Sequence, residues 1–127
     1  MLIAALHSRS PQIALAGRLV FLNWALSLQL WLVSAWLPLL AGYLIIDAVT
    51  AAIFFRMSRG RWFPVPLFLL HAALMVCHAG SVFVEEQESF WVQVLLNRTL
   101  DIELIYITGC ALFRIAVANR AGNIRGA

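Results

Sequence analysis

The chain has 127 residues, of which 63% are hydrophobic and 12% are charged, and its mean hydropathy is +0.89. A soluble domain of this length carries roughly a quarter charged residues, so the composition argues against a water-soluble fold and leaves no room for a separate soluble catalytic domain. The formal net charge of +3 is the balance of nine basic residues, all arginine, against six acidic ones, and the arginines flank apolar segments. This pattern indicates orientation in a membrane and excludes a nucleic-acid reader, which needs a basic face on a folded surface.

The first half of the chain predicts two helices that fold back on each other. Residues 19–55 are almost unbroken in their apolar character, and one helix of that length would be nearly twice as long as a bilayer core of about 30 Å. We place the break at 34–38, because Pro38 favours the first turn of a new helix. Ser10 and Pro11 form a typical cap and first position for the first helix. With two further helices, the predicted helices cover about 11–36, 38–57, 66–84 and 89–119 of a single membrane domain, residues 1–127.

The arginines and the acidic residues predict the topology. Three arginines lie in the segment 56–64, and the acidic turn lies at 85–89. With the N-terminus inside, eight of the nine arginines fall on the cytoplasmic side and Arg98 is the exception. The sequence therefore predicts an all-α, polytopic protein, an antiparallel bundle of four transmembrane helices with both termini in the cytoplasm of a bacterial-type inner membrane. A three-helix alternative places the first helix along the interface.

Polar side chains inside these apolar helices are the candidate site. Each ionisable residue at membrane depth costs about 2.5–3.5 kcal/mol on insertion scales. Depths counted from the outer helix ends place His71 level with Glu103, and Asp47 level with Arg98, and we predict both of these pairs. The predicted intramembrane cluster consists of Asp47, His71, His78, Asn97, Arg98, Asp101 and Glu103.

The fourth predicted helix has polar residues on two faces. Asp101 and Thr108 belong to one stripe, and Glu103 and Tyr106 belong to another on the far side. A helix on the rim of a lone bundle needs only one polar face. The second face therefore predicts a homo-oligomer or membership of a larger membrane complex, with the lipid bilayer as the other partner.

Three interpretations of the cluster stay open. Its members are interhelical hydrogen-bond partners that fix packing, or they serve transport, ion conduction or proton handling, or they bind a metal or haem. A metal would use His78 with Asp47 or Asp101, and the spacing of His71 and His78 is similar to that in membrane b-type cytochromes. No catalytic motif is present, so we expect neither an enzyme nor a bound cofactor.

The size and layout of the chain are similar to those of the small multidrug transporters and of phage holins. The transporters carry an essential acid in their first helix, where this chain has Asn23, Ser27 and Gln29. The central feature of that family is thus missing. The polar cluster itself leads us to expect passage of ions, protons or small molecules, or membrane permeabilisation, through or beside it. A non-catalytic accessory or assembly subunit of a larger complex is the alternative.

Overall fold

The computed structural model of the chain describes the backbone of residues 10–33, 36–84 and 90–125, and the side chains of residues 10–33, 41–81 and 98–119. Within these parts it is all-α, with four helices and no strand, which confirms the predicted fold class at this level. The helices are α2 (Pro11–Val33), α3 (Trp36–Met57), α4 (Val65–Val84) and α5 (Phe90–Arg125). The predicted acidic turn at 85–89 lies outside the described residues.

The helix ends differ from the predicted ends in two informative places. Helix α3 begins at Trp36, two residues before Pro38. Proline is tolerated there because the first N–H groups of a helix have no acceptor within the helix. Helix α5 continues to Arg125, beyond the predicted end near residue 119. The segment after Phe113 contains no proline, the residue that most strongly breaks a helix.

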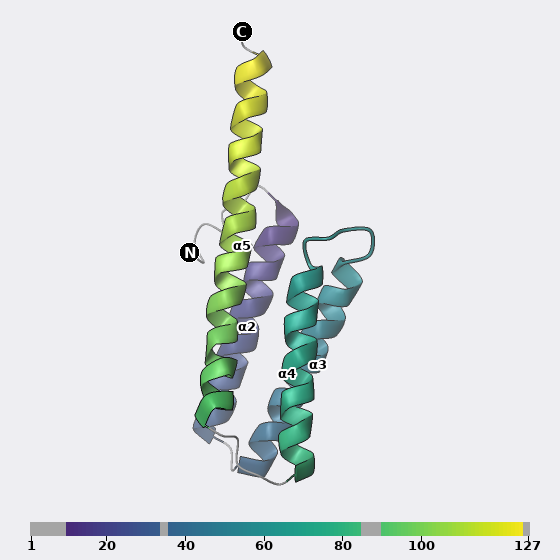
Figure 1. Ribbon diagram of the computed structural model, residues 1–127, viewed down its shortest axis with the longest axis vertical. Helices are drawn as coiled ribbons and strands as arrows, with labels where there is room; N and C mark the ends of the chain where they lie inside the picture. The colour runs from purple at the N-terminus through teal and green to yellow at the C-terminus, as the bar shows by residue number, and fades with distance from the viewer. Residues whose placement is uncertain (1–9, 34–35, 85–89, 126–127) are drawn as a thin grey trace.

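The four helices form a bundle in which consecutive helices run in opposite directions (Figure 1). Helix α3 packs against α4 and α2, and α5 packs mainly against α2 and only slightly against α4. The C-terminal part of α5 extends beyond the other helices (Figure 1). All four helices contribute to one buried apolar core, whose largest members are Val20, Phe54, Leu67 and Ile107.

A turn and two hydrogen bonds connect the helices at one end of the bundle. The turn after α3 contains Gly60 with a φ of 75°, a conformation that glycine adopts without steric cost. A guanidinium nitrogen of Arg114 donates to Oγ of Ser10 at 2.7 Å. The hydroxyl of Tyr106 donates to the carbonyl oxygen of Phe63 at 2.7 Å. These contacts connect α5 to the start of α2 and to the segment before α4.

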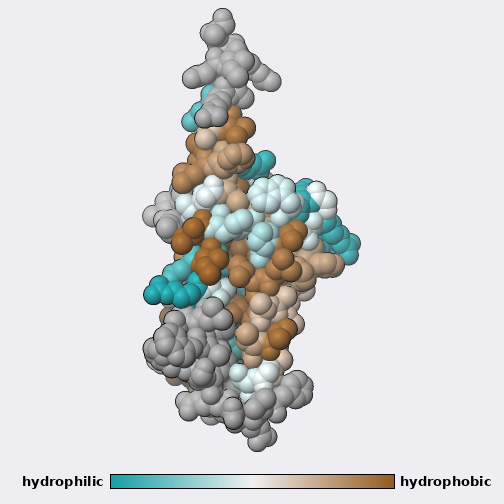
Figure 2. All heavy atoms as spheres, viewed as in Figure 1, coloured by the Kyte–Doolittle hydropathy of each residue, from teal (hydrophilic) through white to brown (hydrophobic). Residues whose placement is uncertain are grey.

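The distribution of polarity is inverted relative to a water-soluble bundle. Asp47, His71, His78 and Glu103 are all buried, with 1–5% of their surface exposed. Large apolar side chains are exposed along the helices, for example Leu32 at 67%, Val76 at 72% and Phe113 at 67%. Figure 2 shows hydrophobic side chains over much of the visible surface of the helices. By length and composition, Pro11–Val33 is the one described helix that could cross a membrane, and Val65–Ser81 is a shorter apolar helix.

Candidate functional site

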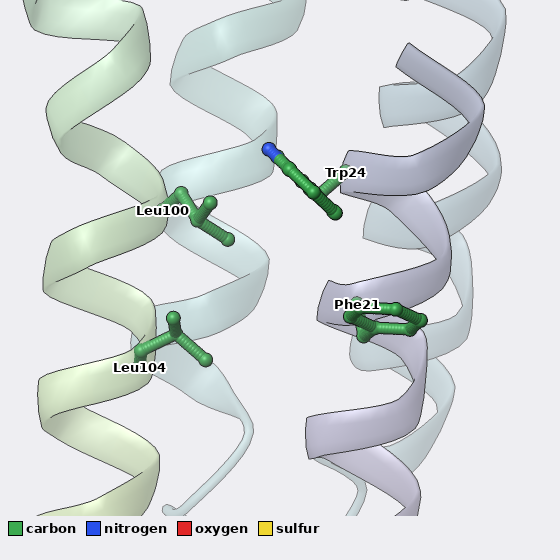
Figure 3. A pocket seen from close by; sticks show the side chains of 4 residues that line it. All are labelled: Phe21, Trp24, Leu100 and Leu104. Atoms are coloured by element: carbon green, nitrogen blue, oxygen red, sulfur yellow. The ribbon is translucent and has the colours of Figure 1, made fainter. Parts of the chain in front are cut away.

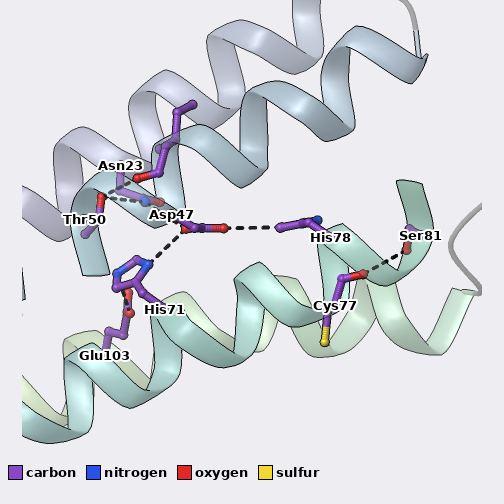
Figure 4. A network of polar contacts seen from close by, with 9 residues as sticks. Asn23, Asp47, Thr50, His71, Cys77, His78, Ser81 and Glu103 are labelled. Carbon is purple, nitrogen blue, oxygen red and sulfur yellow. Dashed lines mark hydrogen bonds and ion pairs between the residues drawn. The ribbon is translucent and has the colours of Figure 1, made fainter. Parts of the chain in front are cut away.

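A chain of polar contacts crosses the interior of the bundle, with at least one side chain from each helix (Figure 4). Asp47 of α3 lies at its centre. Oδ1 of Asp47 accepts a hydrogen bond from Nδ2 of Asn23 at 3.0 Å and lies 2.9 Å from Nδ1 of His71. Oδ2 of Asp47 lies 3.4 Å from Nε2 of His78. One carboxyl group therefore connects α2, α3 and α4.

Helical spacing explains why these side chains point toward one another. Asp47, Thr50 and Phe54 are three, four and seven residues apart on α3 and share its inner face, and His71 and His78 are seven apart on α4. Oγ1 of Thr50 donates to the carbonyl oxygen of Ile46 at 2.8 Å and accepts from Nδ2 of Asn23 at 3.1 Å. The Asn23 amide is thus held against two acceptors of α3.

The imidazole of His71 lies between two carboxyl groups. Its Nδ1 is 2.9 Å from Oδ1 of Asp47, and its Nε2 is 3.0 Å from Oε1 of Glu103. The second contact has the distance of an ion pair but lacks the alignment of a hydrogen bond. The ring is 1% exposed and stacks on Phe54, with a centroid distance of 5.6 Å. Packing therefore fixes the imidazole in a position that bridges α3 and α5.

This geometry constrains the protons that Asp47, His71 and Glu103 hold together. A carboxylate only accepts hydrogen bonds, and a neutral imidazole has one N–H. A proton can lie in each of the two contacts only if the three groups share two protons. Either His71 carries both protons between two carboxylates, or the ring carries one and a carboxyl group carries the other. These forms have the same total charge and differ only in which of the three groups hold the two protons.

His78 extends the chain of contacts along α4. It is 5% exposed, and its ring lies against Tyr43 with a centroid distance of 5.3 Å. Its Nε2 approaches the carboxyl oxygen of Asp47 that His71 does not contact. The two histidines therefore share one carboxylate, one on each oxygen.

The structure brings together four members of the predicted cluster, which are Asp47, His71, His78 and Glu103. The predicted pair of His71 with Glu103 is confirmed at 3.0 Å.

The predicted pair of Asp47 with Arg98 is wrong. Arg98 instead donates to Oδ2 of Asp101 at 3.0 Å, and the two side chains are 72% and 55% exposed. Helix α5 turns Glu103 inward, and at 100° per residue Arg98 and Asp101 lie about 140° and 160° away from it around the helix axis. The side chain of the remaining predicted member, Asn97, lies outside the described residues.

Two members of the network were not among the predicted site residues. Asn23 and Thr50 both bond within it. Asn23 had a usable signal, because it lies thirteen residues before Trp36, the depth that also made His71 and Glu103 level. Thr50 had only its spacing of three residues from Asp47, a weak signal since threonine is common in membrane helices.

The described residues contain no group of three or more His, Cys, Asp or Glu side chains that could hold a metal ion. A second feature is a groove of about 240 Å³ between α2 and α5, lined by Phe21 and Trp24 on one side and Leu100 and Leu104 on the other (Figure 3). Its lining side chains are apolar apart from the indole N–H of Trp24, and none of them titrates. Among the described residues, the buried titratable groups in contact with one another are those of the network around Asp47.

The fold and the site together define a four-helix, all-α bundle with a buried carboxylate–imidazole network. No protein-family model, curated protein or solved structure matches the chain.

Proposed function

We propose that this chain is a multi-pass protein of a bacterial-type inner membrane, in which Asp47, His71 and Glu103 form a proton relay that serves the passage of ions or small molecules. We propose no catalytic activity for it. The observation that carries it is the position of His71 between two carboxyl groups, at 2.9 Å and 3.0 Å.

The inverted polarity supports the membrane location. In water, exposure of many large apolar side chains would favour aggregation, whereas in a bilayer those side chains face lipid. The same environment accounts for the buried ionisable groups, because acids and histidines within membrane helices face the bundle interior and pair with one another. Helix α2 has the length and apolar character of a membrane span, and the apolar sequences of the other helices extend the same interpretation to them.

The arginines support the proposed orientation. Arg56 lies in the last turn of α3, and Arg59 and Arg61 follow in the turn before α4. Arg114 contacts Ser10 at the start of α2, and that start lies at the same end of the bundle as the turn (Figure 1). An excess of arginine at one end marks the cytoplasmic side, and both termini then lie in the cytoplasm.

Flux through liposomes with a pH-sensitive dye inside tests the relay. Asp47→Asn and His71→Gln keep the size and hydrogen-bonding capacity of the side chains but remove the titrating groups. We expect each to reduce proton flux at least about tenfold, as removal of a general acid or base does in other proton transfers. Thr108→Val is the matched control on α5, since Oγ1 of Thr108 has no hydrogen-bond partner among the described residues. Unchanged flux in both network variants would refute the relay.

A second candidate function is that of an accessory or assembly subunit of a larger membrane complex. The exposed Arg98–Asp101 pair favours it, because such a pair on an outer helix face suits contact with another protein. In that case Asp47→Asn would lower only expression or recovery of the complex. Purification in mild detergent, followed by mass determination of everything recovered, separates the two candidates.

A further inference from the structure

One side of α5 combines an ion pair with apolar residues on the outside of the bundle. We refer to it as the outer face of α5. Its members follow one another at intervals of one to four residues, as expected for one helix face, and all are exposed. They are Arg98, Asp101, Ile102, Ile105, Gly109 and Leu112.

The ion pair is poorly satisfied if this face meets lipid. A guanidinium group has five N–H donors, and the contact with Asp101 engages one nitrogen of Arg98. Arg98 lies eight residues from the start of α5, about 12 Å along the helix, which is within the bilayer core if the chain spans it. Charged side chains at that depth normally face protein or water rather than hydrocarbon.

We infer that the outer face of α5 binds the same face of a second copy of this chain, with Arg98 of each copy paired with Asp101 of the other. The inference rests on the proposed membrane location. Both copies have the same orientation, since the arginines orient each in the same way, and the two α5 helices are then parallel about a two-fold axis. Arg98 and Asp101 are three residues apart, about 4.5 Å along the axis, a distance that the long arginine side chain spans.

Charge complementarity is the argument for a second copy as the partner. A face with one cation and one anion a single turn apart can pair with a copy of itself. About a two-fold axis parallel to the helices each residue lies level with its own counterpart, and each arginine side chain reaches one turn along the axis to the aspartate of the other copy. The result is a neutral group of four charges in place of two exposed pairs. Gly109 has nothing within 4 Å of the position that a Cβ would occupy, so a neighbouring helix can approach closely there. Ile105, at 58% exposed, supplies apolar contact beside it.

Charge reversal on separate copies distinguishes pairing between copies from pairing within one. Arg98→Asp gives a copy with two negative charges on this face, and Asp101→Arg gives a copy with two positive charges. Either variant alone places four like charges together, and we expect co-isolation of two differently tagged copies to fall at least about tenfold. Co-expression of the acidic copy with the basic copy should restore it, although the pair within each copy stays broken. Failure of the mixed copies to associate, while wild-type copies do, would overturn the inference.

Cross-linking in native membranes gives a second readout that does not depend on charge. The Ile105→Cys variant, in a background with Cys77→Ala and Cys110→Ala, should form a disulfide-linked dimer when a thiol oxidant is added. Ile45→Cys on α3 is the matched control, since Ile45 is 64% exposed on a different helix, and it should give at least about tenfold less dimer. Equal yields, no dimer from Ile105→Cys, or recovery of wild-type protein only with a different protein would overturn the inference. Absence of the chain from the membrane fraction would instead refute the proposed function.

Discussion

Loss of His71 is predicted to lower the stability of the bundle strongly, because two carboxyl groups depend on it. His71→Leu leaves Asp47 and Glu103 buried without the group between them, and removal of one partner from a buried ion pair costs about 3–5 kcal/mol. Glu103→Leu is expected to cost about 1–3 kcal/mol, since His71 keeps its contact with Asp47. In the double variant no Glu103 carboxyl remains unpaired. The combined cost should therefore be smaller than the sum by about 1–3 kcal/mol.

The measurement is unfolding in mixed detergent micelles, followed by the fluorescence of the five tryptophans. The free energies of unfolding of the wild type, both single variants and the double variant give the coupling energy. A control cycle combines His71→Leu with Val76→Ala, whose side chain is 72% exposed on α4. That cycle should be additive within about 0.5 kcal/mol. If the costs of His71→Leu and Glu103→Leu also add within about 0.5 kcal/mol, the predicted coupling energy between the two residues is refuted.

Two further predictions use the same unfolding measurement. Phe54→Ala should cost about 3–5 kcal/mol, because Phe54 is fully buried and stacks on His71. The matched Phe55→Ala, at a side chain 52% exposed, should cost clearly less, and equal losses would contradict the packing. Tyr106→Phe should cost about 0.5–1.5 kcal/mol, since it removes the bond to the Phe63 carbonyl but keeps the two stacked rings, 5.7 Å apart. No change at all would show that water replaces this bond at no cost.

Depth along a helix was predictable from the sequence, and it gave the correct partner for His71. The apolar segments have recognisable ends, and counting residues from those ends converts directly into height because the rise per residue is constant. His71 and Glu103 came out level by this count and lie 3.0 Å apart. The spacing of seven between His71 and His78 likewise placed both on one face of α4, and both contact Asp47.

Rotation of a helix about its own axis was not predictable for α5. This helix has polar residues on two faces, and periodicity alone does not say which face turns inward. Equal depth suggested Arg98 for Asp47, but the packing of Ile107 and Ala111 in the core, both at most 1% exposed, turns Glu103 inward and Arg98 outward. The inner face of a helix depends on the shapes of its neighbours, information that no single segment contains.

The chemistry of the buried network favours a proton-handling role over a purely structural one. Interhelical packing in membranes is well served by the neutral hydrogen-bonding groups of Asn, Gln, Ser and Thr, and Asn23 and Thr50 already supply such bonds between α2 and α3. Between α3, α4 and α5 the chain instead buries two carboxyl groups and two imidazoles. In the proposed membrane location each of these has an insertion cost that neutral groups would largely avoid. A network built only to hold helices together has no need of titrating groups in contact with one another. A network that moves a proton between two carboxyl groups requires them, with an imidazole between.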